Sequence, residues 1–123
     1  MVAERPILVV DDDATILVSV AELLELEGYV VATAANGAEA LQKTDDLLPG
    51  LVLLDMRMPV LDGWAYARAL RDRGLQPPIV IMTAAQDARR WADEIGADGY
   101  IAKPFEADAL IAAVERIVGP PAA

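Results

Sequence analysis

The sequence predicts an α/β fold in which helices cover a parallel sheet. Strand-like and helix-like segments alternate five times along the chain. Three of the strand-like segments, 7–10, 51–54 and 79–82, are short aliphatic runs, which is typical of strands buried on both faces. The segments between the strands are long enough to form helices. Helical connections of this kind join parallel strands by right-handed crossovers and give a doubly wound sheet.

Turn and cap residues bound each element in order. The predicted elements are a strand at 6–11, a helix at 14–27, a strand at 29–34, a helix at 37–46, a strand at 51–55, a helix from Asp62-Gly63 to about 73, a strand at 79–83, a helix at 87–95, a strand at 99–102 and a helix at 106–118. Glycine follows four of the helices, at 28, 74, 96 and 119, as expected at helix C-termini. Proline-containing pairs at 49–50 and 77–78 precede two of the strands.

Length and charge limit the possible functions. A chain of 123 residues is one domain of common size, and we expect it to span 1–119, with 120–123 as a terminal tail or a linker stub. The net charge of −10 argues against direct nucleic-acid binding. No apolar run approaches the roughly 20 residues of a membrane span, and no signal peptide is evident. These features predict a cytoplasmic protein with no membrane insertion.

The chain contains neither cysteine nor histidine. Disulfides, thiolate zinc sites and thiol nucleophiles are therefore excluded. The commonest general base and the commonest transition-metal ligand are also missing. Any catalysis must rely on carboxylate, hydroxyl or amine groups, and any metal must accept oxygen ligands.

Three carboxylates follow predicted strands. Asp11 and Asp12 come after the first strand, and Asp55 ends the third. The carboxyl ends of parallel strands meet at one edge of a sheet, so the three side chains converge if these strands are neighbours. Carboxylates that share a cleft repel one another unless a cation joins them, and Mg²⁺ (or Mn²⁺) suits oxygen ligands best. The alternative is a solvated acidic turn in which Asp12 or Asp13 caps the first helix.

Two further polar residues follow strands. Thr83 ends the fourth strand and Lys103 follows the fifth, directly before Pro104. A lysine at this edge can pair with a carboxylate or a phosphoryl oxygen, and a threonine hydroxyl can donate to an anionic oxygen. Each residue alone has an ordinary explanation, because threonine is common in strands and lysine is common on surfaces. Together with the carboxylates they indicate a site.

Several short motifs occur in order along nearly the whole chain. They are Val-Val-Asp11-Asp12-Asp13, Ala-Asn36-Gly37-Ala-Glu39-Ala-Leu, Leu-Leu-Asp55-Met-Arg-Met-Pro59, Asp62-Gly63, Met-Thr83-Ala84, Gly96-Ala97-Asp98-Gly99-Tyr100 and Lys103-Pro104-Phe105. In these motifs the chain resembles bacterial response-regulator receiver domains, the CheY-like phosphoacceptor modules of two-component signalling. The resemblance implies a flavodoxin-like (βα)5 fold with strand order 2-1-3-4-5.

The resemblance also implies a role for each site residue. Asp55 is expected to accept a phosphoryl group from a phosphohistidine on a sensor histidine kinase or His-phosphotransfer protein. The implied metal ligands are Asp12 and Asp55 directly, Asp11 through a water, and the backbone carbonyl of Arg57. Lys103 is expected to pair with Asp55 and then with the phosphoryl group. Thr83 is expected to bond a phosphoryl oxygen, with Tyr100 as the aromatic switch residue.

The same resemblance implies how the signal leaves the domain. The face formed by the helix at 87–95, the strand at 99–102 and the helix at 106–118 is expected to change on phosphorylation. A downstream protein target or a missing effector domain would read that change, and a homodimer could form. The protein is then not an enzyme, except that it catalyses its own phosphorylation and dephosphorylation.

Three alternatives compete with this interpretation. A phosphatase of the haloacid-dehalogenase type also uses an aspartate nucleophile, but it needs a second aspartate where Arg57 stands. A flavin carrier of the same topology needs a hydroxyl- and glycine-rich phosphate loop where Asp11, Asp12 and Asp13 stand. The third alternative is a receiver that acts as a phosphorylation-independent protein-interaction module.

The two tryptophans are expected to differ in burial. Trp91 has the helical spacing of Ala88, Ala92 and Ile95, which predicts that it packs inward. Trp64 directly follows Asp62-Gly63, and we expect it to be more exposed near the acidic edge.

Overall fold

The computed structural model describes residues 5–121, which form five strands and five helices in strict alternation. In chain order they are β1 (Ile7–Val10), α1 (Ala14–Glu27), β2 (Val31–Ala34), α2 (Gly37–Leu47), β3 (Leu51–Asp55), α3 (Gly63–Asp72), β4 (Ile79–Ala84), α4 (Ala85–Ile95), β5 (Gly99–Lys103) and α5 (Ala107–Val118). Every predicted element is present. The domain boundary predicted near residue 119 is not tested by this structure and stays a prediction.

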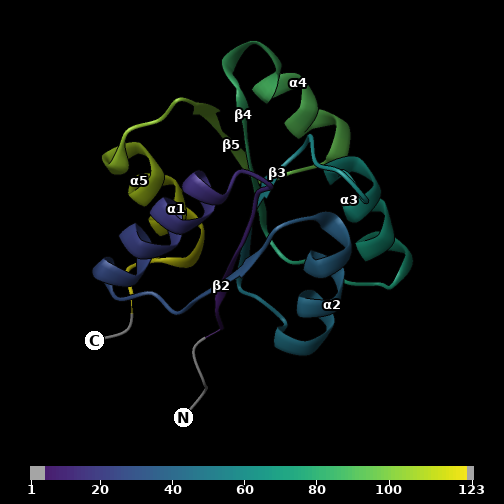
Figure 1. Cartoon of the computed structure of the whole chain (residues 1–123), viewed down its shortest axis with the longest axis horizontal. Helices are drawn as coiled ribbons and strands as arrows, with labels where there is room; N and C mark the ends of the chain where they lie inside the picture. Colours follow the sequence, from purple (N-terminus) through teal and green to yellow (C-terminus); the bar gives the residue numbers. More distant parts are fainter. Residues whose placement is uncertain (1–4, 122–123) are drawn as a thin grey trace.

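The strands form one parallel sheet in the order β2-β1-β3-β4-β5 (Figure 1). This confirms the predicted fold class and strand order. Strand β1 lies between β2 and β3, and Val10 of β1 is in register with Leu54 of β3. The chain segments that follow β1 and β3 therefore emerge side by side at the carboxyl edge, where open α/β sheets place their ligand sites.

Helices cover both faces of the sheet (Figure 1). Successive strand residues point to opposite faces, so each strand contributes to two separate hydrophobic clusters. Helices α1 and α5 pack on one face, around Val9, Leu53 and Leu110. Helices α2, α3 and α4 pack on the other face, around Leu54 and Tyr66. This two-sided burial explains why the strands read as continuous aliphatic runs.

Strand β2 begins at Val31, two residues later than predicted. The cause is the end of α1. Gly28 adopts the left-handed conformation at φ 107°, and its N–H and that of Tyr29 donate to the carbonyls of Glu25 and Leu24. These bonds close the helix in the manner of a Schellman motif. Tyr29 therefore belongs to the helix end.

The junction between β4 and α4 is shorter than predicted. Strand β4 continues through Ala84, and α4 begins at Ala85 rather than at 87. Ala84 occupies the N-cap position without a side-chain cap bond. Alanine and glutamine are good helix formers, so nothing delays the helix until Asp87. Helix α5 begins one residue later than predicted, because Glu106 keeps an extended backbone at the N-cap position.

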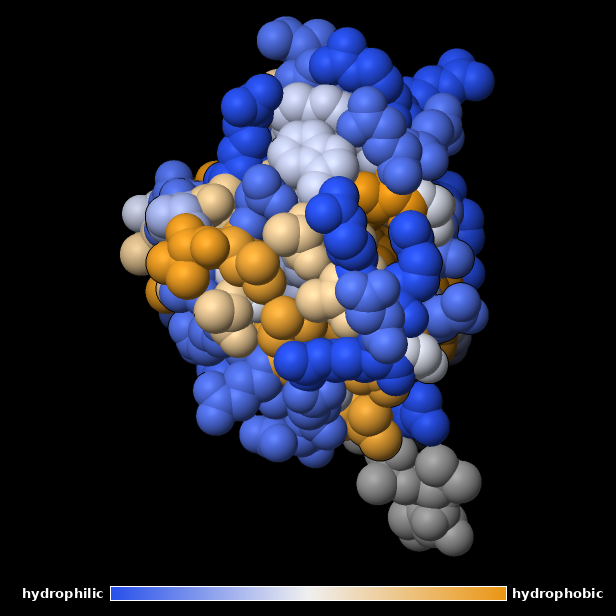
Figure 2. All heavy atoms as spheres, turned by 90° about the vertical axis from the view of Figure 1, so that its right-hand side faces the viewer, coloured by the Kyte–Doolittle hydropathy of each residue, from blue (hydrophilic) through white to orange (hydrophobic). Residues whose placement is uncertain are grey.

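On the side of the molecule that carries α2, α3 and α4, hydrophilic side chains are the most abundant, and apolar side chains form an area that extends across the middle of the view to its left edge (Figure 2). Among the described residues, the exposed large apolar side chains include Leu47, Leu48 and Val60.

Within 5–121, no helix has the length and apolar character needed to cross a membrane.

Gly63 lets α3 start directly against the end of β3. Its N–H donates to the carbonyl of Met56 at 2.9 Å. A Cβ at this position would lie 2.8 Å from the Cα of Met56 and 3.1 Å from the carbonyl oxygen of Asp55. No side chain fits there without moving the backbone that carries Asp55. The close approach thus holds the start of α3 against the end of β3 and brings the two ends of the connecting loop together.

We expect Gly63→Ala to destabilise the protein by about 1–3 kcal/mol, because overpacking against backbone atoms forces a shift of the chain. Chemical denaturation measures the change. Gly99→Ala is the matched control, since a Cβ there meets only side-chain atoms at 3.7 Å. Equal stability of the two variants would contradict the proposed role of Gly63.

Candidate functional site

Asp11, Asp12 and Asp55 converge at the carboxyl edge of the sheet. Each offers a carboxylate oxygen, and these three oxygens lie within 4.8 Å of one another. Asp11 and Asp55 are buried, with 1% and 7% of their surfaces exposed, whereas Asp12 is exposed. The convergence follows from the adjacency of β1 and β3, as the sequence predicts.

The turn after β1 is fixed by its own aspartates. One Asp11 oxygen, Oδ1, accepts the N–H of Asp13 at 2.9 Å. Asp13 in turn caps α1, and its Oδ1 accepts the N–H groups of Thr15 and Ile16. The capping alternative is therefore correct for Asp13, while Asp12 joins the carboxylate cluster. The bond from Asp13 holds the buried Asp11 carboxylate in place.

Lys103, at the end of β5, supplies the positive charge of the cluster. Its Nζ lies 2.8 Å from Asp11 Oδ2 and 3.6 Å from Asp55 Oδ1. The resemblance implied a pair with Asp55, but Asp11 is the closer partner. Burial lowers the pKa of Lys103, but the hydrogen bond to Asp11 and the charges of Asp55 and Asp11 outweigh it, and the net shift is upward. The peptide bond between Lys103 and Pro104 is cis.

The environment of Asp55 disfavours its charged form. Burial is the largest cause, and the charges of Asp11 and Asp12 add to it, while the charge of Lys103 acts in the opposite direction. The result raises the pKa of Asp55 to about 6. The single positive charge of Lys103 does not neutralise the negative charges of the three carboxylates. A further positive charge at the cluster would therefore be stabilised.

The shifted pKa of Asp55 predicts a pH dependence of stability in the metal-free protein. In the folded state the pKa is about 6, against 3.8 for an ordinary aspartate. The folded state therefore binds more protons between these values, and the contribution of Asp55 to the free energy of unfolding falls as pH rises through this window. We expect the stability gain of Asp55→Asn over wild type to grow from pH 4 to pH 6 and then level off.

Thermal melts of both proteins in EDTA measure this difference. A gain that does not change with pH would contradict the assigned environment of Asp55.

The donor set fits a hard divalent cation. The cluster consists of carboxylate oxygens alone, and the chain has no histidine or cysteine that would favour a softer metal. Mg²⁺ and Mn²⁺ take a few carboxylates and retain coordinated waters or phosphate oxygens. Asp11, Asp12 and Asp55 are the residues that could hold such an ion.

Thr83 and Tyr100 lie on the strands beside the cluster. Thr83 is 6% exposed near the end of β4, one residue beyond Met82, which is in register with Asp55. Tyr100 lies on β5 in register with Ile81, and 46% of its surface is exposed. The structure thus buries Thr83 on the strand next to that of Asp55, whereas Tyr100 lies one strand further away and is exposed.

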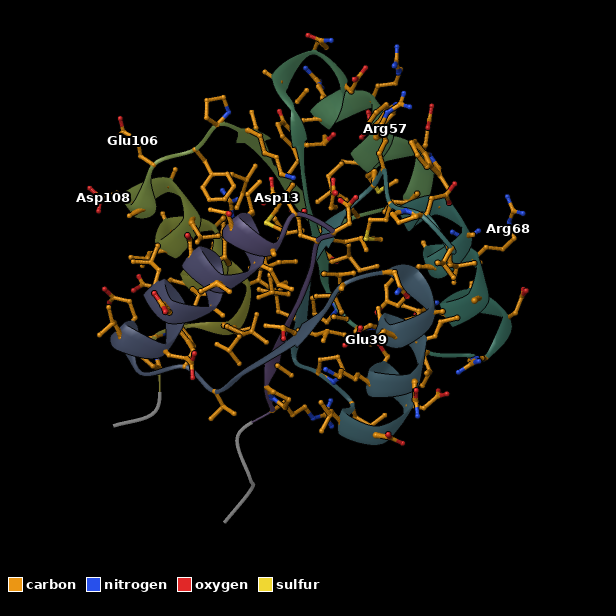
Figure 3. All side chains as sticks on the ribbon, viewed as in Figure 1. Asp13, Glu39, Arg57, Arg68, Glu106 and Asp108 are labelled. Carbon is orange, nitrogen blue, oxygen red and sulfur yellow. The ribbon has the colours of Figure 1, made fainter. Side chains whose placement is uncertain are left out.

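Arg57 lies in the loop between β3 and α3, and its side chain is directed to α4 (Figure 3). Its Cζ sits 5.0 Å from the centroid of the Trp91 ring, in a cation–π arrangement. Trp64 packs edge-on against Trp91 with centroids 4.8 Å apart, and its Nε1 donates to Glu94. Trp91 is buried as predicted, and Trp64 is half-buried.

The contact between Arg57 and Trp91 was not expected from the sequence. The helical spacing that predicts an inward Trp91 gives no sign of which loop residue meets its ring. The only available signal was the presence of a long cation near the carboxyl edge and an aromatic residue on the adjacent helix.

Comparisons with known proteins agree with this architecture. The sequence model of the response regulator receiver domain matches residues 7–115. The transcriptional regulatory protein PrrA of Mycobacterium tuberculosis is 41% identical over 114 residues, which cover 91% of this chain and 49% of that protein. The alkaline phosphatase synthesis transcriptional regulatory protein PhoP of Bacillus subtilis is 39% identical, with 93% of this chain and 48% of PhoP covered. The chain spans about half the length of these curated relatives.

Solved structures show the same fold. The chemotaxis protein CheY4 of Vibrio cholerae superposes with a TM-score of 0.84 at 31% identity, covering 94% of this chain and 99% of that one. The receiver domain of NtrX from Brucella abortus gives a TM-score of 0.83 at 35% identity, covering 91% and 97%. The order of the strands, the carboxylates after β1 and β3, and these matches lead to one conclusion. The chain belongs to the response regulator receiver domain family.

Proposed function

We propose that this receiver domain is a phosphorylation-dependent switch in which Asp55 accepts the phosphoryl group. One observation carries the proposal. The buried Asp55 carboxylate has an oxygen within 4.8 Å of oxygens of Asp11 and Asp12, and it lies 3.6 Å from the Lys103 ammonium. A nucleophile beside a cation and a potential metal site is the arrangement that phosphoryl transfer requires, because the reaction depends on positioning and charge neutralisation.

The transfer is in line. An Asp55 carboxylate oxygen forms the new P–O bond while the P–N bond of a phosphohistidine breaks, and the electron pair remains on the imidazole nitrogen. In our proposal Asp12 and Asp55 would hold a Mg²⁺ ion directly, Asp11 would hold it through a water, and the Arg57 carbonyl would complete the protein ligands. When bound, the ion would supply positive charge that offsets the charge of the phosphoryl oxygens. Lys103 pairs with a phosphoryl oxygen.

Phosphorylation adds about two negative charges at the carboxyl edge. The Thr83 hydroxyl donates to a phosphoryl oxygen, which moves Thr83 and opens space behind it. Tyr100, now 46% exposed, then packs inward on β5. The face formed by α4, β5 and α5 changes as the population of this second conformation rises.

The partners follow from the chemistry and from the relatives. The 123 residues contain no histidine, so the donor phosphohistidine lies outside them, and we propose a sensor histidine kinase or a His-phosphotransfer protein as its source. The output is read by a downstream protein or by an effector domain, and the matched relatives PrrA and PhoP are named transcriptional regulatory proteins. Phosphorylation could also promote a homodimer. We propose that residues 1–119 form the receiver domain and 120–123 a tail or linker stub, and of these 1–4 and 122–123 lie outside the described residues.

Uptake of a phosphoryl group from acetyl phosphate tests the proposal. Intact-protein mass spectrometry should show one added phosphoryl group in MgCl₂ and none in EDTA, because the metal-free carboxylates repel the donor. Restoring Mg²⁺ should restore uptake. No uptake in MgCl₂, or equal uptake in EDTA, would contradict a metal-dependent phosphoacceptor.

A further inference from the structure

An aromatic cluster borders the carboxylate site. It consists of Trp91 and Glu94 of α4, Trp64 of α3 and Arg57 of the β3–α3 loop. The guanidinium of Arg57 lies over the Trp91 ring. Trp64 contacts the Trp91 ring edge-on and donates a hydrogen bond to Glu94, and these two contacts hold the Trp91 ring in place. In Figure 3, Arg57 lies beside α4 and apart from Asp13, which marks the start of α1. The arginine is thus held to one side of the site.

Arg57 also borders the metal site. An open cavity of about 380 Å³ is lined by Asp12, Arg57, Met58, Pro59, Asp62 and Trp64. Asp62 is already engaged, because its Oδ1 caps α3 through the N–H of Ala65. Lys103 pairs with Asp11 and Asp55. Among residues 5–121, Asp12 has no ion pair with a lysine or arginine, so its carboxylate is open to a cation from this cavity.

Two cations can therefore compete for Asp12. The planar guanidinium of arginine binds a carboxylate through two parallel hydrogen bonds, and Arg57 lines the same cavity as Asp12. A divalent ion needs the same oxygens. The side chain of Arg57 is long enough to adopt other rotamers, and the contact that retains it over α4 is the face of Trp91, the aromatic ring that attracts cations best.

We propose that Trp91 is a positioning residue for the metal site. By holding the Arg57 guanidinium over its ring, it keeps Asp12 available to the divalent cation. The inference rests on the metal site of the proposed function. It predicts that Trp91 affects metal binding only through Arg57.

A double-mutant cycle tests this dependence. Isothermal titration calorimetry with MgCl₂ and no phosphodonor gives the Kd of wild type, Trp91→Leu, Arg57→Met and the double variant. Trp91→Leu should weaken Mg²⁺ binding about 3- to 10-fold, which is the range expected when one cation–π contact is lost. In the Arg57→Met background the same substitution should change the Kd by less than about 2-fold, the range within which independent substitutions are additive.

Trp91→Phe is a second variant in case Trp91→Leu does not fold. It keeps an aromatic ring in the core. Its ring attracts cations less strongly, so it should weaken binding by a smaller factor than Trp91→Leu, again only where Arg57 is present. Thermal melts establish that each protein is folded at the titration temperature.

The outcomes separate this inference from the proposed function. Suppose that wild type binds Mg²⁺, and that the Trp91 substitutions weaken binding equally with and without Arg57, or do not weaken it in either case. The positioning role of Trp91 is then wrong, and the metal site is unaffected by that result. If wild type binds no Mg²⁺, both the inference and the proposed function are overturned.

Discussion

Asp55→Asn is expected to abolish phosphoryl uptake from acetyl phosphate and from a partner phosphohistidine. The amide has no anionic oxygen with which to attack phosphorus, and the remaining carboxylates are not positioned to replace it. Asp11 is held by Lys103 at 2.8 Å and by the N–H of Asp13 at 2.9 Å. Asp12 is exposed and is expected to serve as a metal ligand. We therefore expect a complete loss within the detection limit of mass spectrometry.

Asp13→Asn is the matched control for this variant. Asp13 lies next to the cluster in sequence, but its carboxylate caps α1, and asparagine is an equally good N-cap residue. The control should take up the phosphoryl group at close to the wild-type rate. Uptake by Asp55→Asn at the rate of the control would contradict the assignment of Asp55.

Lys103→Met is expected to slow phosphoryl uptake by a factor of about 10²–10³, the usual effect of removing one group that stabilises transition-state charge. The ammonium is the only one within ion-pair distance of Asp55 and Asp11 among residues 5–121. Its loss also removes the one charge that lowers the pKa of Asp55, so the reacting carboxylate becomes harder to ionise. Initial rates of uptake from acetyl phosphate in MgCl₂, followed by intact-protein mass spectrometry at one pH, measure the effect.

Lys43→Met provides the control, because Lys43 is the only other lysine of the chain. It pairs with Glu39 at 3.1 Å and donates to the carbonyl of Thr33, and the ion pairs of Asp11 and Asp55 within residues 5–121 involve Lys103 and not Lys43. Its loss should leave the uptake rate unchanged. If both lysine variants behaved alike, Lys103 would have no specific part in the transfer.

The fold could be predicted because its signals are local. The strands are buried on both faces and appear as uninterrupted aliphatic runs, such as Leu51–Leu54. Helix ends carry glycines, and Gly28 and Gly96 adopt the left-handed conformation expected of them. The carboxylate cluster could also be predicted, since parallel strands bring their carboxyl ends together whatever lies between them in sequence.

What the sequence did not reveal depends on contacts between distant segments. The preference of Lys103 for Asp11 over Asp55 is a matter of less than 1 Å between side chains that are 92 and 48 residues apart. The contact of Arg57 with Trp91 joins a loop to a helix that begins 28 residues later. The start of β2 shifted because backbone hydrogen bonds at Gly28 and Tyr29 close α1. No periodic pattern of residues carries this information.

The position of the attached phosphoryl group distinguishes Asp55 from the neighbouring carboxylates. After incubation with acetyl phosphate and MgCl₂, borohydride reduction converts a phosphorylated aspartate to homoserine, and peptide mass spectrometry locates the change. We expect homoserine at position 55 alone, and none when EDTA replaces MgCl₂. Homoserine at Asp11, Asp12 or Asp13, or unmodified Asp55 in a protein that has taken up the phosphoryl group, would contradict this expectation.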